Sequence, residues 1–160
     1  MKKQIMIAVV LSLIITGCIK KPDKLMSPAA RIDITIEDNK EVYNLTVTAG
    51  VLNENNSTAI IDYSADLILK DAGSANIAQF SVKTKSILPF EKYYIDASKK
   101  LNEQEAMKIV DALSLNREEL IKSKTASTLF IDDKNISLSG ISYKTSDIVD
   151  LLKRKTNEKN

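Results

Sequence analysis

The stretch Tyr43-Asn44-Leu45-Thr46-Val47-Thr48-Ala49-Gly50-Val51 places an apolar side chain at every second position. Successive side chains of a strand point to opposite faces, so this pattern predicts a β-strand with one buried face and one polar face. The same alternation runs from Ile32 to Ile36 before it and from Ile61 to Leu69 after it. Such runs, separated by polar turns, are typical of an antiparallel sheet with one face buried.

Weaker runs of the same kind complete the predicted strands. Ala78 to Val82 is followed by Tyr93 to Ala97, the pattern resumes at Thr128 and Phe130 with Ile131 as a further member, and the last run covers 136–143. Gly140 inside the last run predicts a β-bulge. Seven short strands predict an antiparallel β-sandwich of immunoglobulin- or fibronectin-like shape, because one open sheet would leave an apolar face unpaired.

The phase of these runs predicts which side chains form the core. We expect Asp62, Ser64 and Asp66 to lie outside. The side chains expected inside are Leu45, Val47, Ile61, Tyr63, Leu67 and Phe80.

Residues 103–122 break the β pattern with helical spacing. Asn102 and Glu105 have the spacing of a capping box, and Asn116 and Glu119 repeat it. We expect two short helices, or one helix broken near Ser114, packed flush against a sheet edge. The alternative is a helical insert that stands off from the sheet and covers a pocket. The apolar stripe of this insert comprises Ile109, Val110, Leu113, Leu120 and Ile121.

The start of the chain has the pattern of an export signal. Lys2 and Lys3 precede an apolar run over residues 5–15, which is shorter than the roughly 20 residues that a membrane-spanning helix needs. The next residues, Ile15-Thr16-Gly17-Cys18, resemble a bacterial lipobox. By that resemblance the chain is cleaved after Gly17, the Cys18 thiol is diacylated, and the new amino group is a further acylation site. A signal peptide with an incidental cysteine is the alternative.

These features predict four parts of the chain. Residues 1–17 are the signal peptide, 18–30 a lipidated tether, 31–152 the sandwich and 153–160 a flexible tail. The tether carries charges and two prolines, which favour an extended, mobile segment; the alternative is that Leu25 and Met26 begin the core. At the other end, Ser146 is expected to cap a last helix that contains Ile148, Val149, Leu151 and Leu152.

The order of elements from Val47 to Tyr94 is strand, Asn-rich turn (52–56), long strand, Asp71-Ala72-Gly73 turn, strand, Leu88-Pro89-Phe90 and another strand. This order resembles the LEA14-like, or water-stress-and-hypersensitive-response, domains of bacterial lipoproteins. The resemblance covers roughly residues 31–144 and implies a β-sandwich with a helical segment before a closing hairpin. The chain departs from the family in that Asn53 is followed by Glu54, not proline. FxLYD domains share the turns but do not require the helices.

The residue types present exclude several chemistries. The chain has no histidine, and Cys18 is its only cysteine, so serine triads, Cys–His pairs and zinc sites lack a required member. Its four glycines are too far apart for a phosphate-binding loop. Removal of Lys2 and Lys3 with the signal leaves 21 basic and 21 acidic side chains, a balance that does not favour nucleic acid. We therefore expect no catalytic, cofactor or metal site.

Carboxylate pairs are the remaining candidates for chemistry. Asp62 and Asp66 lie four apart on one strand, and Asp132 and Asp133 share a turn. They could supply calcium ligands or an acid–base pair; the alternative is a solvated strand face and a polar turn. The adjacent Tyr93 and Tyr94 point to opposite faces of a strand, which would expose one of them to a partner. The alternative places one ring in the core and the other against a helix.

The leading hypothesis is a non-catalytic lipoprotein of the cell envelope, anchored by the lipid on Cys18, that binds or supports another envelope protein. The family name suggests a role in stress. The rival hypothesis is a carrier of small ligands or lipids, with its pocket between the helical insert and the sheet. Ile19, where a retention signal would place Asp, predicts the periplasmic face of the outer membrane in a cell with two membranes, and the outer face of the cell membrane otherwise.

Overall fold

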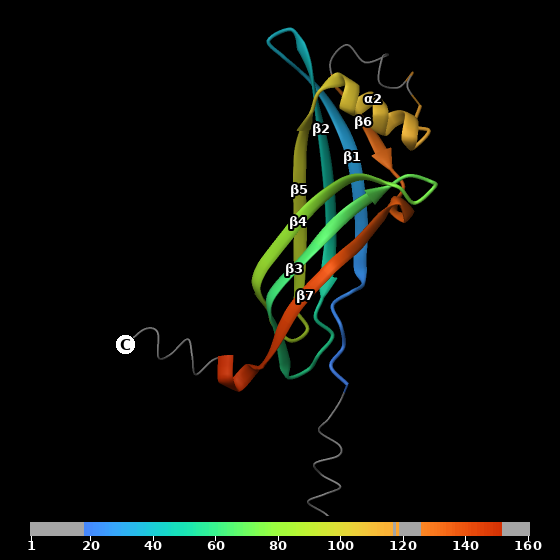
Figure 1. The fold of residues 1–160 in the computed structure, drawn as a ribbon. Coiled ribbons are helices and arrows are strands. Elements are labelled where there is room, and N and C mark those ends of the chain that lie inside the picture. The colour runs from blue at the N-terminus through green and yellow to red at the C-terminus, as the bar shows by residue number, and fades with distance from the viewer. Residues whose placement is uncertain (1–17, 117, 119–125, 152–160) are drawn as a thin grey trace, which may run out of the picture.

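The computed structural model describes residues 18–116, 118 and 126–151, and it shows two antiparallel sheets packed against each other (Figure 1). One sheet has the strand order β5-β2-β1-β6 and the other has the order β4-β3-β7. The predicted β-sandwich is therefore confirmed. The elements are β1 (Leu25–Glu37), β2 (Lys40–Leu52), β3 (Thr58–Lys70), β4 (Asn76–Ile87), β5 (Lys92–Leu101), α2 (Glu103–Ala112), β6 (Ala126–Ile131), the 3-10 turn η1 (Asp133–Asn135) and β7 (Ile136–Asp147).

The alternation in β1 and β2 forms the middle of the four-stranded sheet. Ile32 pairs with Leu45 and Ala30 with Val47, and all four side chains are buried between the sheets. Asn44, Thr46 and Thr48 therefore lie on the outer face. The Asp38-Asn39 turn joins the strands with both residues at positive φ, as a two-residue hairpin turn requires.

A bulge at Asp62 shifts the phase of β3. Asp62 has a φ of 51°, and the pairing with β7 slips between Ile61 and Ser64. Tyr63, Ala65 and Leu67 point inward as predicted. Ahead of the bulge, however, Ile60 is fully buried and Ile61 is only half-buried. The predicted burial of Ile61 is wrong because the extra residue reverses the alternation. Phe80 is likewise only partly buried, although it packs against the core.

The phase of β6 also differs from the sequence pattern by one residue. Leu129 pairs with the inward-facing Ile32, and Ile131 pairs with Ala30, so both side chains are buried. Phe130 pairs with Arg31 on the outer face and is 76% exposed. The buried residues of β1 fix this register, because only one phase of β6 extends their apolar surface.

The sheet begins earlier than the predicted tether allows. Leu25 and Met26 already pair with Val51 and Gly50 in β1, and Pro22 is fully buried. Only residues 18–24 precede the sheet in the described chain. The predicted tether, which ends at residue 30, therefore overlaps β1. Of the alternative in which Leu25 and Met26 begin the core, only the Leu25 part holds, since Leu25 packs against the core whereas Met26 lines a surface hollow. The prolines did not exclude a strand because Pro28 lies at an irregularity in the pairing between Met26 and Ala29.

Helix α2 closes one end of the core. Its capping box is formed, since Asn102 accepts from the Glu105 N–H and Glu105 accepts from the Asn102 N–H. This backbone bond holds the pKa of the Glu105 carboxyl below its ordinary value. The helix ends where Ser114 adopts a φ of 52° and the Leu115 N–H bonds to the Val110 carbonyl, which confirms the predicted break. The expected second helix falls mostly on residues outside those described.

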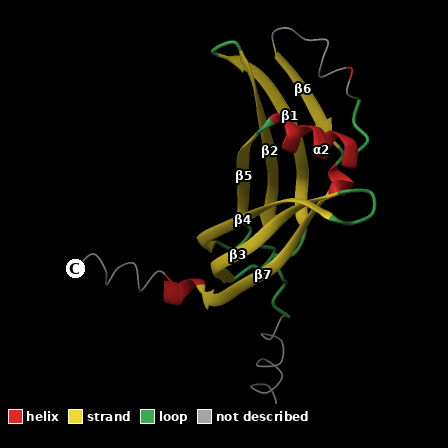
Figure 2. Cartoon of the chain, turned by 45° about the horizontal axis from the view of Figure 1, so that its top comes forward, coloured by secondary structure: helices red, strands yellow, loops and turns green. Residues whose placement is uncertain are grey.

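The position of α2 corrects one expectation. Figures 1 and 2 show β3, β4 and β7 crossing one part of the four-stranded sheet, while α2 covers another part of the same inner face. Ala106, Ile109 and Val110 are buried there in the common core. The helix thus packs flush, as predicted, but on the inner face and not at a sheet edge. It is needed to close the sandwich because the second sheet covers only part of the first.

The last strand carries the predicted bulge and leads into the final turn of helix. Gly140 has a φ of 58°, and the pairing with β3 slips between Ser64 and Asp66, which confirms the bulge. Residues 148–151 are helical. The Val149 N–H near the start of this helical turn bonds to the Asp147 carboxylate. Asp147 therefore caps the helix, and the predicted cap at Ser146 is wrong. Ser146 is still part of β7.

Candidate functional site

Cys18 lies exposed at one end of the sandwich, which we call the base. The base consists of residues 18–24, the β2–β3 turn (53–57), the β4–β5 turn (88–91) and the last helical turn (148–151). Cys18, Ile19 and Phe90 line a shallow hollow of about 400 Å³ there, together with residues of the β2–β3 turn. The other predicted lipobox residues, Ile15, Thr16 and Gly17, lie outside the described residues. The proposed attachment point is therefore accessible at the base.

A side-chain amide fastens the chain next to Cys18. The Asn55 Oδ1 accepts from the Lys20 N–H at 2.9 Å, and its Nδ2 donates to the Lys20 carbonyl at 3.0 Å. Asn55 thus pairs with Lys20 as a neighbouring strand would. Lys20 Nζ also lies 3.4 Å from a Glu54 carboxylate oxygen. Asparagine-rich sequence here predicts a turn, but nothing in its spacing indicates a contact 35 residues away.

Asn53 holds the rest of the base together. Its Nδ2 donates to the carbonyls of Thr58 and Ile87, both at 2.9 Å. Its Oδ1 accepts from the Asn55 N–H and from Asn55 Nδ2 at 3.1 and 2.8 Å. Its main chain bonds to Phe90 and Glu91. Asn53 is buried with all these groups satisfied, so the two turns of the base and the segment after Cys18 form one connected unit.

The carboxylates of the two sequence pairs contact nearby side chains. Asp62 accepts from Lys144 Nζ at 2.9 Å, whereas Asp66 accepts from Ser81 Oγ at 2.7 Å. Asp132 caps η1 and pairs with Lys134, whose hydrogen bond lowers the pKa of Asp132. Asp62, Asp66 and Asp132 each have a local partner. Over the described residues, no group of three or more His, Cys, Asp and Glu side chains gathers to hold a metal ion.

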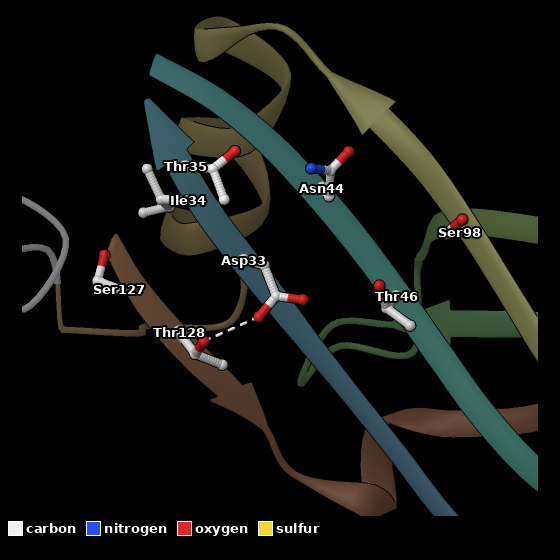
Figure 3. A pocket seen from close by; sticks show the side chains of 8 residues that line it. All are labelled: Asp33, Ile34, Thr35, Asn44, Thr46, Ser98, Ser127 and Thr128. Carbon is white, nitrogen blue, oxygen red and sulfur yellow. Dashed lines mark hydrogen bonds between the residues drawn. The ribbon is translucent and has the colours of Figure 1, made fainter. Parts of the chain in front are cut away.

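The outer face of the four-stranded sheet carries the largest hollow that we describe. It has a volume of about 460 Å³, and its floor consists of short polar side chains of adjacent strands (Figure 3). Asp33 lies in the middle, where its two carboxylate oxygens accept from Arg31 Nε and Thr128 Oγ1, each at 2.8 Å. The Thr35 hydroxyl beside it is buried and has no partner within the described structure.

Two exposed aromatic side chains flank this face. Phe130 stands on edge strand β6, and Tyr94 stands on the opposite edge strand β5, where it is 71% exposed with Lys92 Nζ 5.7 Å from the ring centroid. Between Tyr94 and Met26, Gly50 leaves a second hollow of about 350 Å³ open. We call this surface the outer face; its main residues are Arg31, Asp33, Asn44, Thr46, Thr48, Gly50, Tyr94, Ser98, Thr128 and Phe130.

The sequence missed Phe130 as a surface residue because a phenylalanine in an alternating run is usually assigned to the core. The sequence did predict that the side chains of Tyr93 and Tyr94 point to opposite faces of the strand. Tyr93 is half-buried and meets Tyr63 edge-on, with the ring centroids 6.5 Å apart. Burial raises the pKa of Tyr63 to about 12, with smaller contributions from Tyr93 and Asp23. The Tyr63 hydroxyl has no partner among the described residues.

Helix α2 lines none of the hollows described above. No helix in the described part of the chain has the length and apolar character that crossing a membrane requires. Comparison of the chain with protein-family models, with curated proteins and with solved structures finds no match.

Proposed function

We propose that this protein is a non-catalytic lipoprotein of the bacterial cell envelope, anchored through Cys18, whose outer face binds another envelope protein. The anchor rests on the resemblance of Ile15-Thr16-Gly17-Cys18 to a lipobox. The domain type that we propose is the LEA14-like one, on the resemblance of residues 31–144. A stress-related role is part of that proposal.

The observation that carries the binding function is the pair of exposed aromatic rings on the outer face. Phe130 and Tyr94 project from opposite edge strands across a floor of hydroxyl and amide groups. Aromatic side chains of this kind supply much of the binding energy at protein interfaces, while polar groups around them fix the orientation. A solvated sheet face without a partner does not explain two such exposed rings.

The rival function, a ligand carrier, finds less support. Its pocket would lie between α2 and the sheet, but the inward side chains of α2 are packed into the core. The hollows on the outer face are open to solvent, whereas lipid carriers enclose an apolar cavity. We therefore favour the binding module.

Crosslinking in intact cells tests this function. A photoreactive amino acid at position 130 should yield a discrete protein adduct, and Tyr94→Ser in the same chain should reduce it severalfold. The control places the same group at Ile36, which is also exposed but lies on the inner side of β1. Equal adducts from both positions, or none from position 130, would contradict a specific partner on the outer face.

A further inference from the structure

Exposed apolar side chains gather at the base, around the proposed point of lipid attachment. Ile19, Phe90 and Val149 are 46%, 67% and 54% exposed, and Leu88 is exposed beside Phe90. Phe90 and Ile19 line one hollow with Cys18. The Ile148 N–H bonds to the Ser57 carbonyl at 3.2 Å, which brings the last helical turn to the same β2–β3 turn. Clustered exposed apolar residues mark a contact with a partner or a membrane.

The turn that presents Phe90 is strained. The Glu91 N–H bonds to the Leu88 carbonyl, and Phe90 sits at the third position of this turn with a φ of 58°. Glycine or asparagine is the usual residue there, and a larger side chain costs roughly 1–2 kcal/mol in the left-handed region. Phe90 gains little from packing because most of it is exposed. Folding alone does not explain an aromatic residue at this position.

The segment that connects the base to the anchor is very short. Because Asn55 holds both backbone groups of Lys20, only Ile19 separates this fixed point from Cys18. Two residues span at most about 7 Å. A whole bilayer is roughly 10–15 Å thicker than its hydrocarbon core, and the headgroup layer on each side accounts for about half of this difference. The headgroup layer is therefore about as thick as the span from Lys20 to Cys18. An acylated Cys18 therefore draws the base into the headgroup layer.

We propose that the base lies directly on the bilayer, with Phe90, Leu88 and Ile19 inserted into its interfacial layer, so that the anchor holds the sandwich in a fixed upright orientation. This inference rests on the proposed lipid anchor at Cys18. The charges of the base are mixed, with Lys20, Lys21 and Lys24 near Asp23, Glu54 and Glu91. The contact is therefore apolar in character, and zwitterionic phosphatidylcholine is sufficient for it. The outer face remains free for a partner.

Tryptophan fluorescence tests the insertion without background, because the chain contains no tryptophan. The mature lipoprotein carrying Phe90→Trp is first shown by mass to be acylated and is then placed in phosphatidylcholine vesicles with brominated acyl chains. Bromine quenches tryptophan at short range, so Trp emission at position 90 should shift to the blue and lose most of its intensity. Added salt should leave both effects unchanged.

The matched control is Phe130→Trp, an equally exposed aromatic position. It pairs with Arg31, six residues and about 20 Å along β1 from Leu25, so its emission should remain unquenched. Leu88→Trp serves as a second probe of the base if Phe90→Trp does not fold. Quenching of neither probe, or equal quenching at positions 90 and 130, would overturn the upright contact while the anchor stands. A purified protein without acyl chains would overturn the anchor itself, and the inference with it.

Discussion

Replacing Asn53 with alanine removes the amide that joins the turns of the base. Two carbonyls, those of Thr58 and Ile87, lose their donor, and Asn55 loses the acceptor for two N–H groups. A buried polar group left without a partner costs about 1–3 kcal/mol. Counting only the two carbonyls, and allowing for water near Thr58, we expect Asn53→Ala to lower the free energy of unfolding by about 2–5 kcal/mol.

The measurement is urea unfolding of residues 18–160 carrying Cys18→Ser, with circular dichroism as the signal. The midpoint should fall at unchanged slope, which identifies a change in stability and not in the compactness of the unfolded chain. Asn56→Ala, an exposed change in the same turn, is the control and should alter stability by less than about 0.5 kcal/mol. If Asn53→Ala behaves like Asn56→Ala, the hydrogen bonds of Asn53 do not hold the base together.

Three further predictions use the same titration. Leu67→Ala empties a fully buried site and should cost about 2–5 kcal/mol; a loss below about 0.5 kcal/mol would refute the register of β3. Gly140→Ala should cost roughly 1–2 kcal/mol because of its positive φ and a new Cβ 3.1 Å from Asp66 Oδ2; unchanged stability would refute the bulge geometry. The native state holds the Tyr63 proton more tightly, with a pKa of about 12 against 10, so stability should fall from pH 10 to 12. Tyr63→Phe should reduce that fall without loss at pH 7; an identical pH profile would contradict the buried hydroxyl.

Most of the fold could be predicted from alternation and turn chemistry. The two-residue period of a strand alone predicts that Val47 faces inward and Thr48 faces outward. The capping box at Asn102 marked where the β pattern ends. These signals are local, and the structure agrees with them because packing and local preference favour the same conformation.

The errors arose where a distant contact decides the local structure. Ile61 loses its inward position to Ile60 because the bulge at Asp62 depends on pairing with β7. Phe130 faces outward because β1 fixes the phase of β6. Leu25 joins the sheet because β2 offers it a partner. In each case the neighbouring strand lies far along the chain, so periodicity within the segment could not predict which side chains face inward or where the strand begins.

The candidate surfaces were predictable to different degrees. Cys18 was found from a short local motif, and its exposure at the base agrees with a role as an attachment point. The outer face and the ring of apolar residues at the base were not found, because each combines residues from several strands and turns. Individually, Phe90 looked like part of a link between two strands, and Phe130 looked like an ordinary strand residue.

The state of Cys18 in cells that make the protein tests the proposed anchor most directly. Metabolic labelling with a fatty acid, followed by mass analysis of the N-terminal peptide, should show a labelled chain that begins at Cys18 and carries a diacylglycerol on its thiol. Cys18→Ser should abolish the label and leave an uncleaved or mis-sorted precursor. A Cys18→Ser protein that is still labelled and membrane-bound at the normal level would contradict the proposed anchor.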